Sequence, residues 1–473
     1  MKQTKIVASI SDRRCDVDFI RKLFDAGMNV VRMNTAHATP DGIKTIIRNT
    51  RAVSKHIGIL IDTKGPEVRT TGNESPISYK TGDVVKIFGR PEMDTEHDIV
   101  NLSYENFAND VHVGDDILFD DGAIDMKVIG INGPAVIAQV QNDGKLGSHK
   151  SVNVPGVHID LPALTEKDKA NILLAIEQDI DFIAHSFVRS KADVMAVQKI
   201  LDEHNSDIKI ISKIENQEGV DNIDEIIEAS YGIMIARGDL GIEVPYYKVP
   251  TIQKLIIKKA NAANRPVITA TQMMLSMAKS QSATRAEISD VANAVLDGTD
   301  AVMLSEESAV GINPVAVVKS MSATIVQSEL IYPYGKFDEF EFADETDMVA
   351  SASSHLAQRI GANAIISITS SGSSAIKMAR NRPTMPIIAV THDESVARSL
   401  TIVWGVTPSL VVPQNQLNLL LANTIKGLKD ANLISDEATY TLTAGYPAGK
   451  IGSTNYIRIL RKEQIKYYLN EVK

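Results

Sequence analysis

Short apolar runs recur along this chain, and amphipathic stretches separate many of them. A run of four or five apolar residues bounded by polar ones is typical of a strand that is buried on both faces. Stretches between the runs, such as 167–177 and 193–203, repeat apolar residues at helical spacing. Eight such runs precede residue 305, at 5–8, 29–33, 57–62, 180–184, 208–211, 232–236, 267–270 and 301–304. Eight buried strands with intervening helices predict a closed (β/α)8 TIM barrel.

One connection in this pattern is much longer than a loop and a helix. Residues 71–153 alternate polar and apolar side chains between turn signals such as Asn132-Gly133. We expect a β-rich domain there, inserted after the third barrel strand as a lid over the barrel. Beyond residue 335, four more apolar runs predict an open α/β sheet, since four strands are too few for a barrel. The expected domains are therefore a barrel formed by 1–70 and 154–335, a lid formed by 71–153, and a C-terminal domain formed by 336–473.

Composition and charge narrow the class of protein. Of the 473 residues, 44% are hydrophobic and 23% are charged, as in an ordinary folded protein. The formal net charge of −10 argues against a surface that binds nucleic acid. No run approaches the roughly 18 apolar residues of a membrane span, and we find no signal peptide. The only cysteine, Cys15, excludes an intramolecular disulfide. We therefore expect a cytoplasmic protein that binds neither nucleic acid nor membranes.

Polar side chains follow several of the predicted barrel strands, at the point where each strand ends. Residues two apart on a strand point the same way, so pairs at this spacing share a face. Such pairs and single polar residues end seven strands: Arg32 with Asn34, Lys213 with Glu215, Arg237 with Asp239, and Asp62, Ser186, Thr271 and Ser305. Because barrel enzymes assemble their sites at the C-terminal ends of strands, we expect these side chains to meet at one mouth.

The residue types at this mouth restrict its chemistry. Glu215 and Asp239 are hard oxygen donors without a nearby histidine, which favours Mg²⁺ or Mn²⁺ over zinc. Arg32, Lys213 and Arg237 are suited to phosphate and carboxylate partners. A divalent metal flanked by such cations favours phosphoryl transfer and also suits an enolate. The run that begins at Arg237 lies between a strand and a helix, so its N–H groups can hold a small anion.

Six segments of the chain are distinctive: AGMNVVRMN at 26–34, DTKGPEVR at 62–69, IISKIENQEGV at 210–220, IARGDLG at 235–241, ATQM at 270–273 and TRAEISDVANAVLDG at 284–298. With these segments in this order, the sequence resembles the pyruvate kinase family over essentially its full length. The resemblance implies a barrel, a lid and a C-terminal domain. It also implies transfer of a phosphoryl group from phosphoenolpyruvate to ADP, which gives pyruvate and ATP in the last step of glycolysis.

The resemblance implies a role for each matching residue at the mouth. Glu215 and Asp239 would hold the Mg²⁺ or Mn²⁺, and Lys213 and Arg32 would neutralise the migrating phosphoryl group. Thr271 and Ser305 both match positions associated with delivering a proton to the enolate. The N–H groups of Gly238 and Asp239 would hold the substrate carboxylate together with the Thr271 hydroxyl. The expected substrate-binding residues are Arg32, Lys213, Gly238, Asp239, Thr271 and Ser186.

The nucleotide and a monovalent cation complete the implied site. The residues expected at the nucleotide are Arg69, Lys150, Asn34, His37 and Asp121. The sequence at 9–12 reads SISD where the family has TIGP, so the preferred nucleotide stays open. Asn34, Asp62 and Thr63 match the family's K⁺ ligands. Because Ala36 replaces a hydroxyl ligand, we expect K⁺ stimulation with weaker binding.

A serine-rich segment in the predicted C-terminal domain is a candidate regulatory site. Its hydroxyl and N–H groups suit a phosphate, although a turn with a helix N-cap is an equally plain interpretation. The resemblance implies an activating phosphorylated effector there, such as a sugar phosphate, with a second loop at 446–455 that closes over it. It also implies a homotetramer. The candidate effector residues are Thr369, Ser370, Ser371, Gly372, Ser373 and Ser374.

Two other functions fit parts of the pattern. A Mg²⁺-dependent lyase or aldolase on the same barrel would use the same carboxylates, with Lys213 as a nucleophile in a Schiff-base version. The lid and its Lys150 argue against it, since a lyase needs no nucleotide-binding domain. A catalytically silent sugar-phosphate sensor would explain the departures at Ala36 and Glu306. The intact carboxylate pair and Lys213 argue against the sensor.

Overall fold

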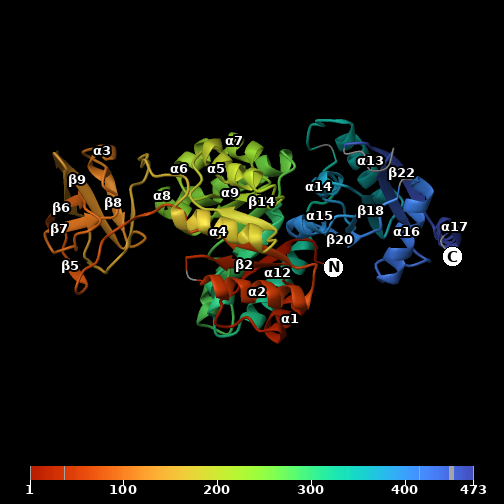
Figure 1. Cartoon of the computed structure of the whole chain (residues 1–473), viewed down its shortest axis with the longest axis horizontal. Helices are drawn as coiled ribbons and strands as arrows, with labels where there is room; N and C mark the ends of the chain where they lie inside the picture. Colours follow the sequence, from red (N-terminus) through yellow and green to blue (C-terminus); the bar gives the residue numbers. More distant parts are fainter. Residues whose placement is uncertain (1, 37, 338, 415, 447–451, 472–473) are drawn as a thin grey trace.

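The eight predicted strands close a parallel barrel at the centre of the molecule (Figure 1). The structure is a computed structural model that describes residues 2–36, 38–337, 339–414, 416–446 and 452–471. The order around the barrel is β1-β17-β16-β15-β14-β13-β3-β2, which confirms the predicted fold class. The strands are β1 (Lys5–Ser9), β2 (Val30–Asn34), β3 (Gly58–Asp62), β13 (Phe182–His185), β14 (Lys209–Ile214), β15 (Gly232–Ala236), β16 (Val267–Ala270) and β17 (Ala301–Leu304).

The barrel strands are apolar throughout because both of their faces are buried. In β1, Val7 packs inside the barrel, whereas Ile6 and Ala8 pack against the surrounding helices. Capping boxes begin two of these helices, at Thr165 and Thr284. The helices are α1 (Val17–Asp25), α2 (Pro40–Val53), α4 (Glu166–Glu177), α5 (Lys191–Glu203), α6 (Gln217–Asp221), α7 (Ile223–Ala229), α8 (Arg237–Glu243), α9 (Val249–Ala262), α10 (Arg285–Asp297), α11 (Glu306–Ala309) and α12 (Pro314–Glu329).

The insertion after β3 forms a β-rich domain that extends from one end of the barrel (Figure 1). Its main sheet has the order β4-β12-β8-β9-β10-β6-β7, and β11 pairs with β5. The chain enters this domain through β4 and leaves it through β12. These two strands pair with each other, with Val68 opposite Val152. The elements are β4 (Val68–Arg69), β5 (Ile77–Tyr79), β6 (Val84–Gly89), β7 (Ile99–Leu102), α3 (Phe107–Asp110), β8 (Asp116–Phe119), β9 (Ile124–Asn132), β10 (Ala135–Val140), β11 (Gly144–Leu146) and β12 (Ser151–Asn153).

The C-terminal domain is an open α/β sheet of order β20-β19-β18-β21-β22. The four predicted strands are parallel, and β22 pairs antiparallel with β21 at the edge. Within the described ranges, no helix combines the length and apolar character needed to cross a membrane. The elements are α13 (Glu345–Arg359), β18 (Ala364–Ile368), α14 (Ser373–Arg380), β19 (Ile387–Thr391), α15 (Glu394–Ser399), β20 (Val406–Leu410), α16 (Leu417–Asp430), β21 (Tyr440–Gly445), β22 (Thr454–Leu460) and α17 (Lys462–Glu471).

A buried carboxylate joins the C-terminal domain to the barrel. Asp181, directly before β13, accepts hydrogen bonds from Arg51 of α2 at 2.9 and 3.0 Å. Arg398 of α15 donates to the same carboxylate at 2.5 Å, and so does the Ile59 N–H of β3 at 2.7 Å. Because Asp181 and Ile59 lie at the start of their strands, the C-terminal domain contacts the barrel on the face opposite the predicted mouth.

Candidate functional site

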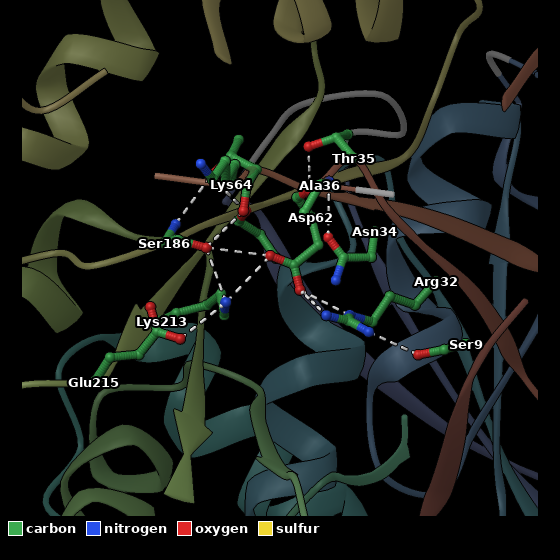
Figure 2. A network of polar contacts seen from close by, with 12 residues as sticks. Ser9, Arg32, Asn34, Thr35, Ala36, Asp62, Lys64, Ser186, Lys213 and Glu215 are labelled. Carbon is green, nitrogen blue, oxygen red and sulfur yellow. Dashed lines mark hydrogen bonds and ion pairs between the residues drawn. The ribbon is translucent and has the colours of Figure 1, made fainter. Parts of the chain in front are cut away.

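Four charged side chains from three barrel strands form a continuous network (Figure 2). Arg32 Nη2 lies 2.6 Å from Asp62 Oδ2, and Lys213 Nζ lies 3.2 Å from Asp62 Oδ1. Lys213 Nζ also lies 2.9 Å from Glu215 Oε1. The structure therefore brings together residues that the sequence assigned to metal, substrate and K⁺.

Both partners of the Lys213–Asp62 pair are stabilised in their charged forms. Burial alone would raise the pKa of Asp62, but Lys213 and Arg32 outweigh it and lower that pKa. Burial alone would lower the pKa of Lys213, but Asp62 and Glu215 outweigh it and raise that pKa. Lys213 is therefore a fixed positive charge, which disfavours a neutral nucleophilic amine.

Glu215 and Asp239 form the candidate divalent-metal site. Glu215 is 1% exposed, and burial, with a contribution from the nearby Asp239, raises its pKa to about 7. A divalent cation shared by the two carboxylates would offset both effects, so the donor set fits Mg²⁺ or Mn²⁺. Among the described residues no group of three or more His, Cys, Asp or Glu is arranged so that it could hold a metal ion.

Two serines extend the network beyond the charged groups. Ser186 Oγ accepts a hydrogen bond from Lys213 Nζ at 2.8 Å and donates to the Thr63 carbonyl at 2.7 Å. Ser9 was not predicted as a site residue, yet its Oγ accepts a hydrogen bond from Arg32 at 2.8 Å. Ser9 is the last residue of β1, so the strand-end criterion that selected the other residues applies to it as well.

Thr271 is held in a strained loop at the end of β16. Its φ of 66° and the φ of 55° at Gln272 lie in the left-handed region, which is costly for a β-branched residue. Arg237 donates to the carbonyls of Ala270 at 3.2 Å and Thr271 at 2.8 Å, and pairs with Asp290 at 2.7 Å. Our expectation that Arg237 binds an anion at the mouth is therefore wrong, because its guanidinium supports this loop.

The hydroxyl groups of Thr271 and Ser305 differ in their partners. Thr271 Oγ1 accepts the Gly238 N–H at 2.7 Å and donates to the Ala270 carbonyl at 2.7 Å. Ser305 Oγ is buried and has no hydrogen-bond partner among the described residues. The residue next to it, Glu306, is exposed.

The residues expected at the nucleotide lie mainly in the lid. A cavity of about 310 Å³ lies between the lid and the barrel. Asp121 of the lid and Asp239 of the barrel both line it. Lys150 pairs with Asp120 at 2.9 Å, and Arg69 pairs with Glu67 at 2.7 Å. Arg69 and Lys150 both lie in the described part of the chain, and neither of them lines this cavity. His37 lies outside the described residues.

The three expected K⁺ ligands lie on neighbouring strands. Asn34 of β2 is the register partner of Asp62 of β3, and Thr63 follows directly. Asn34 Oδ1 accepts the Ala36 N–H at 3.0 Å. Thr63 Oγ1 accepts the Ser186 N–H at 3.0 Å. Asn34 lies beside the charged network, of which Asp62 is a member (Figure 2).

The serine-rich segment lines a second cavity, of about 300 Å³, in the C-terminal domain. The segment joins β18 to α14, and Gly372 has a φ of 84°. The Gly372 N–H donates to Thr369 Oγ1 at 3.0 Å. Five of its six residues line the cavity, namely Thr369, Ser370, Ser371, Ser373 and Ser374. Part of the loop at 446–455 that was expected to close over it, at 447–451, lies outside the described residues.

Known proteins resemble this chain along most of its length. Residues 1–318 match the family model "Pyruvate kinase, barrel domain", and residues 347–460 match "Pyruvate kinase, alpha/beta domain". Two proteins named pyruvate kinase, from Staphylococcus aureus strains MRSA252 and USA300, are 41% and 42% identical over 97% of this chain and 80% of theirs. A crystal structure of a pyruvate kinase from Cryptosporidium parvum superposes with a TM-score of 0.92 at 35% identity, covering 97% of this chain and 96% of that one.

The raised pKa of Glu215 predicts that divalent-metal binding depends on pH. A metal ligand must be deprotonated, and a carboxyl with a pKa of about 7 is mostly protonated at pH 6 and mostly ionised at pH 8. We expect the affinity for Mn²⁺ to increase by about tenfold between these two pH values. Electron paramagnetic resonance of free Mn²⁺ measures it directly. Glu215→Gln should abolish the dependence, and an equal affinity at both pH values in the unmodified protein would contradict this prediction.

Proposed function

This chain belongs to the pyruvate kinase family and transfers a phosphoryl group from phosphoenolpyruvate to ADP, and we propose that the charged network at the barrel mouth performs this transfer. The relatives named pyruvate kinase match 97% of the chain, which favours this activity over the lyase and sensor alternatives. The network of Arg32, Asp62, Lys213 and Glu215 is the observation that supports the proposal. Members of this family require a divalent metal and K⁺.

Lys213 and Arg32 neutralise the phosphoryl group as it moves from the oxygen of phosphoenolpyruvate to the phosphate oxygen of ADP. Charge accumulates on the transferred group in the transition state, so fixed cations that are already oriented lower the barrier. Asp62 holds both cations at 3.2 Å or less and keeps them oriented without substrate. Glu215 and Asp239 hold the Mg²⁺ or Mn²⁺, which supplies Lewis-acid stabilisation of the substrate oxygens when bound.

The loop around Thr271 binds the substrate carboxylate. On binding, the N–H of Gly238 exchanges its bond to Thr271 Oγ1 for a bond to the carboxylate, and the N–H of Asp239 donates beside it. The unpartnered Ser305 Oγ is free to orient a water that protonates the enolate carbon. Thr271 Oγ1 already has two partners, which favours Ser305 for this second role.

ADP binds in the cavity between the lid and the barrel, with Asp121 toward its phosphates or their metal. Arg69 and Lys150 do not line the cavity while they pair with Glu67 and Asp120, and they reach the nucleotide by exchanging these partners for phosphate oxygens. Asn34 lies on the barrel side of the nucleotide, where His37 is also expected.

Replacing Lys213 tests the central assignment. We expect Lys213→Met to reduce kcat by at least about a hundredfold, because one cation at the migrating phosphoryl group is lost. A coupled assay for pyruvate, run with and without Mg²⁺, measures it. Lys209→Met is the matched control, since Lys209 starts the same strand at its opposite end. Near-normal turnover of Lys213→Met, with both variants folded, would refute the role of Lys213.

A K⁺ ion bound by Asn34, Asp62 and Thr63 is the second testable assignment. We expect a several-fold higher kcat in KCl than in tetramethylammonium chloride of equal ionic strength, since the larger cation cannot replace a dehydrated ion. Ala36→Ser restores the hydroxyl ligand that this chain lacks, and should lower the K⁺ concentration that gives half-maximal activity. Equal rates in both salts would contradict the assignment.

The cavity that the serine-rich segment lines in the C-terminal domain is proposed to bind an activating sugar phosphate. Its hydroxyls and the start of α14 provide donors for a phosphate, and Lys377 lies on its wall. We expect glucose 6-phosphate or fructose 1,6-bisphosphate to increase the rate at subsaturating phosphoenolpyruvate. The exposed Ser371 can be replaced by Glu, whose charge should abolish this activation. No activation of the unmodified protein by either compound would contradict the proposal.

The assembly and location follow the family as further proposals. We propose that the protein is a homotetramer and that it is located in the cytoplasm. Sedimentation velocity of the purified protein tests the oligomeric state. A sedimentation coefficient of a monomer, at the concentrations used for kinetic assays, would contradict the tetramer.

A further inference from the structure

One hydrogen bond joins the lid directly to the helix that carries Asp239. Asn153 Nδ2 donates to Glu243 Oε1 at 2.7 Å. Asn153 is the last residue of β12, where the chain leaves the lid, and Glu243 is the last residue of α8. Both side chains are half-buried, and both line the cavity of about 310 Å³ in which ADP is proposed to bind.

The lid side of this bond leads to the nucleotide residues. Side chains two apart on a strand share a face, so Ser151 and Asn153 project from the same face of β12. Ser151 Oγ donates to Asp121 Oδ1 at 2.7 Å. Lys150 directly precedes the strand and pairs with Asp120. A movement of Asn153 therefore also moves the residues that are proposed to contact the ADP phosphates.

The barrel side of the bond leads to the metal site. Asp239 and Glu243 are four residues apart on α8, which places them on one face of that helix. Asp239 contributes to the raised pKa of Glu215 and to the raised pKa of Glu243, so it lies near each of these two carboxyl groups. An uncharged amide donor holds Glu243 without adding a cation that would compete with the metal.

We propose that Asn153 and Glu243 are positioning residues that align the lid with the metal site, so that ADP lies in line with the phosphoryl group. The inference rests on the proposed binding of ADP beneath the lid. In-line transfer requires the two reacting oxygens at fixed positions, and a displacement of about 1 Å costs up to about a hundredfold in rate. Phosphoenolpyruvate contacts the barrel alone, so its binding does not depend on this hydrogen bond.

Exchanging the donor and the acceptor tests the proposal. Asn153→Asp places two carboxylates in contact and should lower kcat/KM for ADP by more than about tenfold. The double variant Asn153→Asp with Glu243→Gln restores a donor and an acceptor in reversed order, and should recover most of the loss. Calorimetric titration with phosphoenolpyruvate and Mg²⁺, without ADP, should give a Kd within about twofold of the unmodified protein in all variants, since the barrel contacts are intact.

Two controls separate the outcomes. Lys127→Met alters an ion pair within the lid, to Asp116, and should leave the kinetics for ADP unchanged. Lys150→Met tests the binding of ADP beneath the lid independently of the hydrogen bond. Unchanged kinetics of Asn153→Asp beside a raised KM for ADP in Lys150→Met would overturn the positioning role and leave the nucleotide site standing. Failure of the double variant to recover, or an equal loss of phosphoenolpyruvate binding, would also overturn it.

Discussion

A single buried carboxylate, Asp62, makes the catalytic mouth of this enzyme physically possible. Two cations, Arg32 and Lys213, lie within 3.2 Å of it in a site that is nearly closed to water. Without Asp62 the two cations would repel each other and lose their hydration without compensation. With it they stay charged and oriented before substrate arrives, so that little reorganisation accompanies the transfer step. Glu215 and Ser186, which are proposed to bind the metal and the substrate, both contact Lys213 of this ion pair.

The barrel determines where each of these groups lies, whereas the loops determine how they are aimed. Parallel pairing sets Ser9 beside Arg32 and Asn34 beside Asp62, so the strand register brings these members of the network together. At β16 the chain instead adopts two successive left-handed residues, Thr271 and Gln272. Arg237 stabilises that conformation by bonding two carbonyl groups of the loop. Two adjacent strained residues therefore lie in the segment that is proposed to present a hydroxyl and N–H groups to the substrate.

Much of this architecture could be predicted from the sequence, because buried parallel strands have an unmistakable apolar pattern. The bounds of β15, β16 and β17 are as predicted. Strand β22 was not predicted, since it lies at an edge and alternates polar with apolar residues. The role of Arg237 was wrong because residue type and strand position do not specify which carbonyls a long side chain reaches. The bond between Asn153 and Glu243 spans 90 residues of sequence, and only the packing of the lid on the barrel brings its two ends together.

The carboxylate of Asp181 has a consequence for the whole molecule. It accepts hydrogen bonds from Arg398 of the C-terminal domain and from the Ile59 N–H near the start of β3, and it directly precedes β13. The opposite ends of these two strands lead to Asp62 and Ser186. Strands of four or five residues are about 13 to 17 Å long, so two short extended segments link the domain junction to the groups that are proposed to react. A small rigid rotation of the C-terminal domain would therefore act directly on these two strands, and a link of this kind would require no segment to unfold or refold.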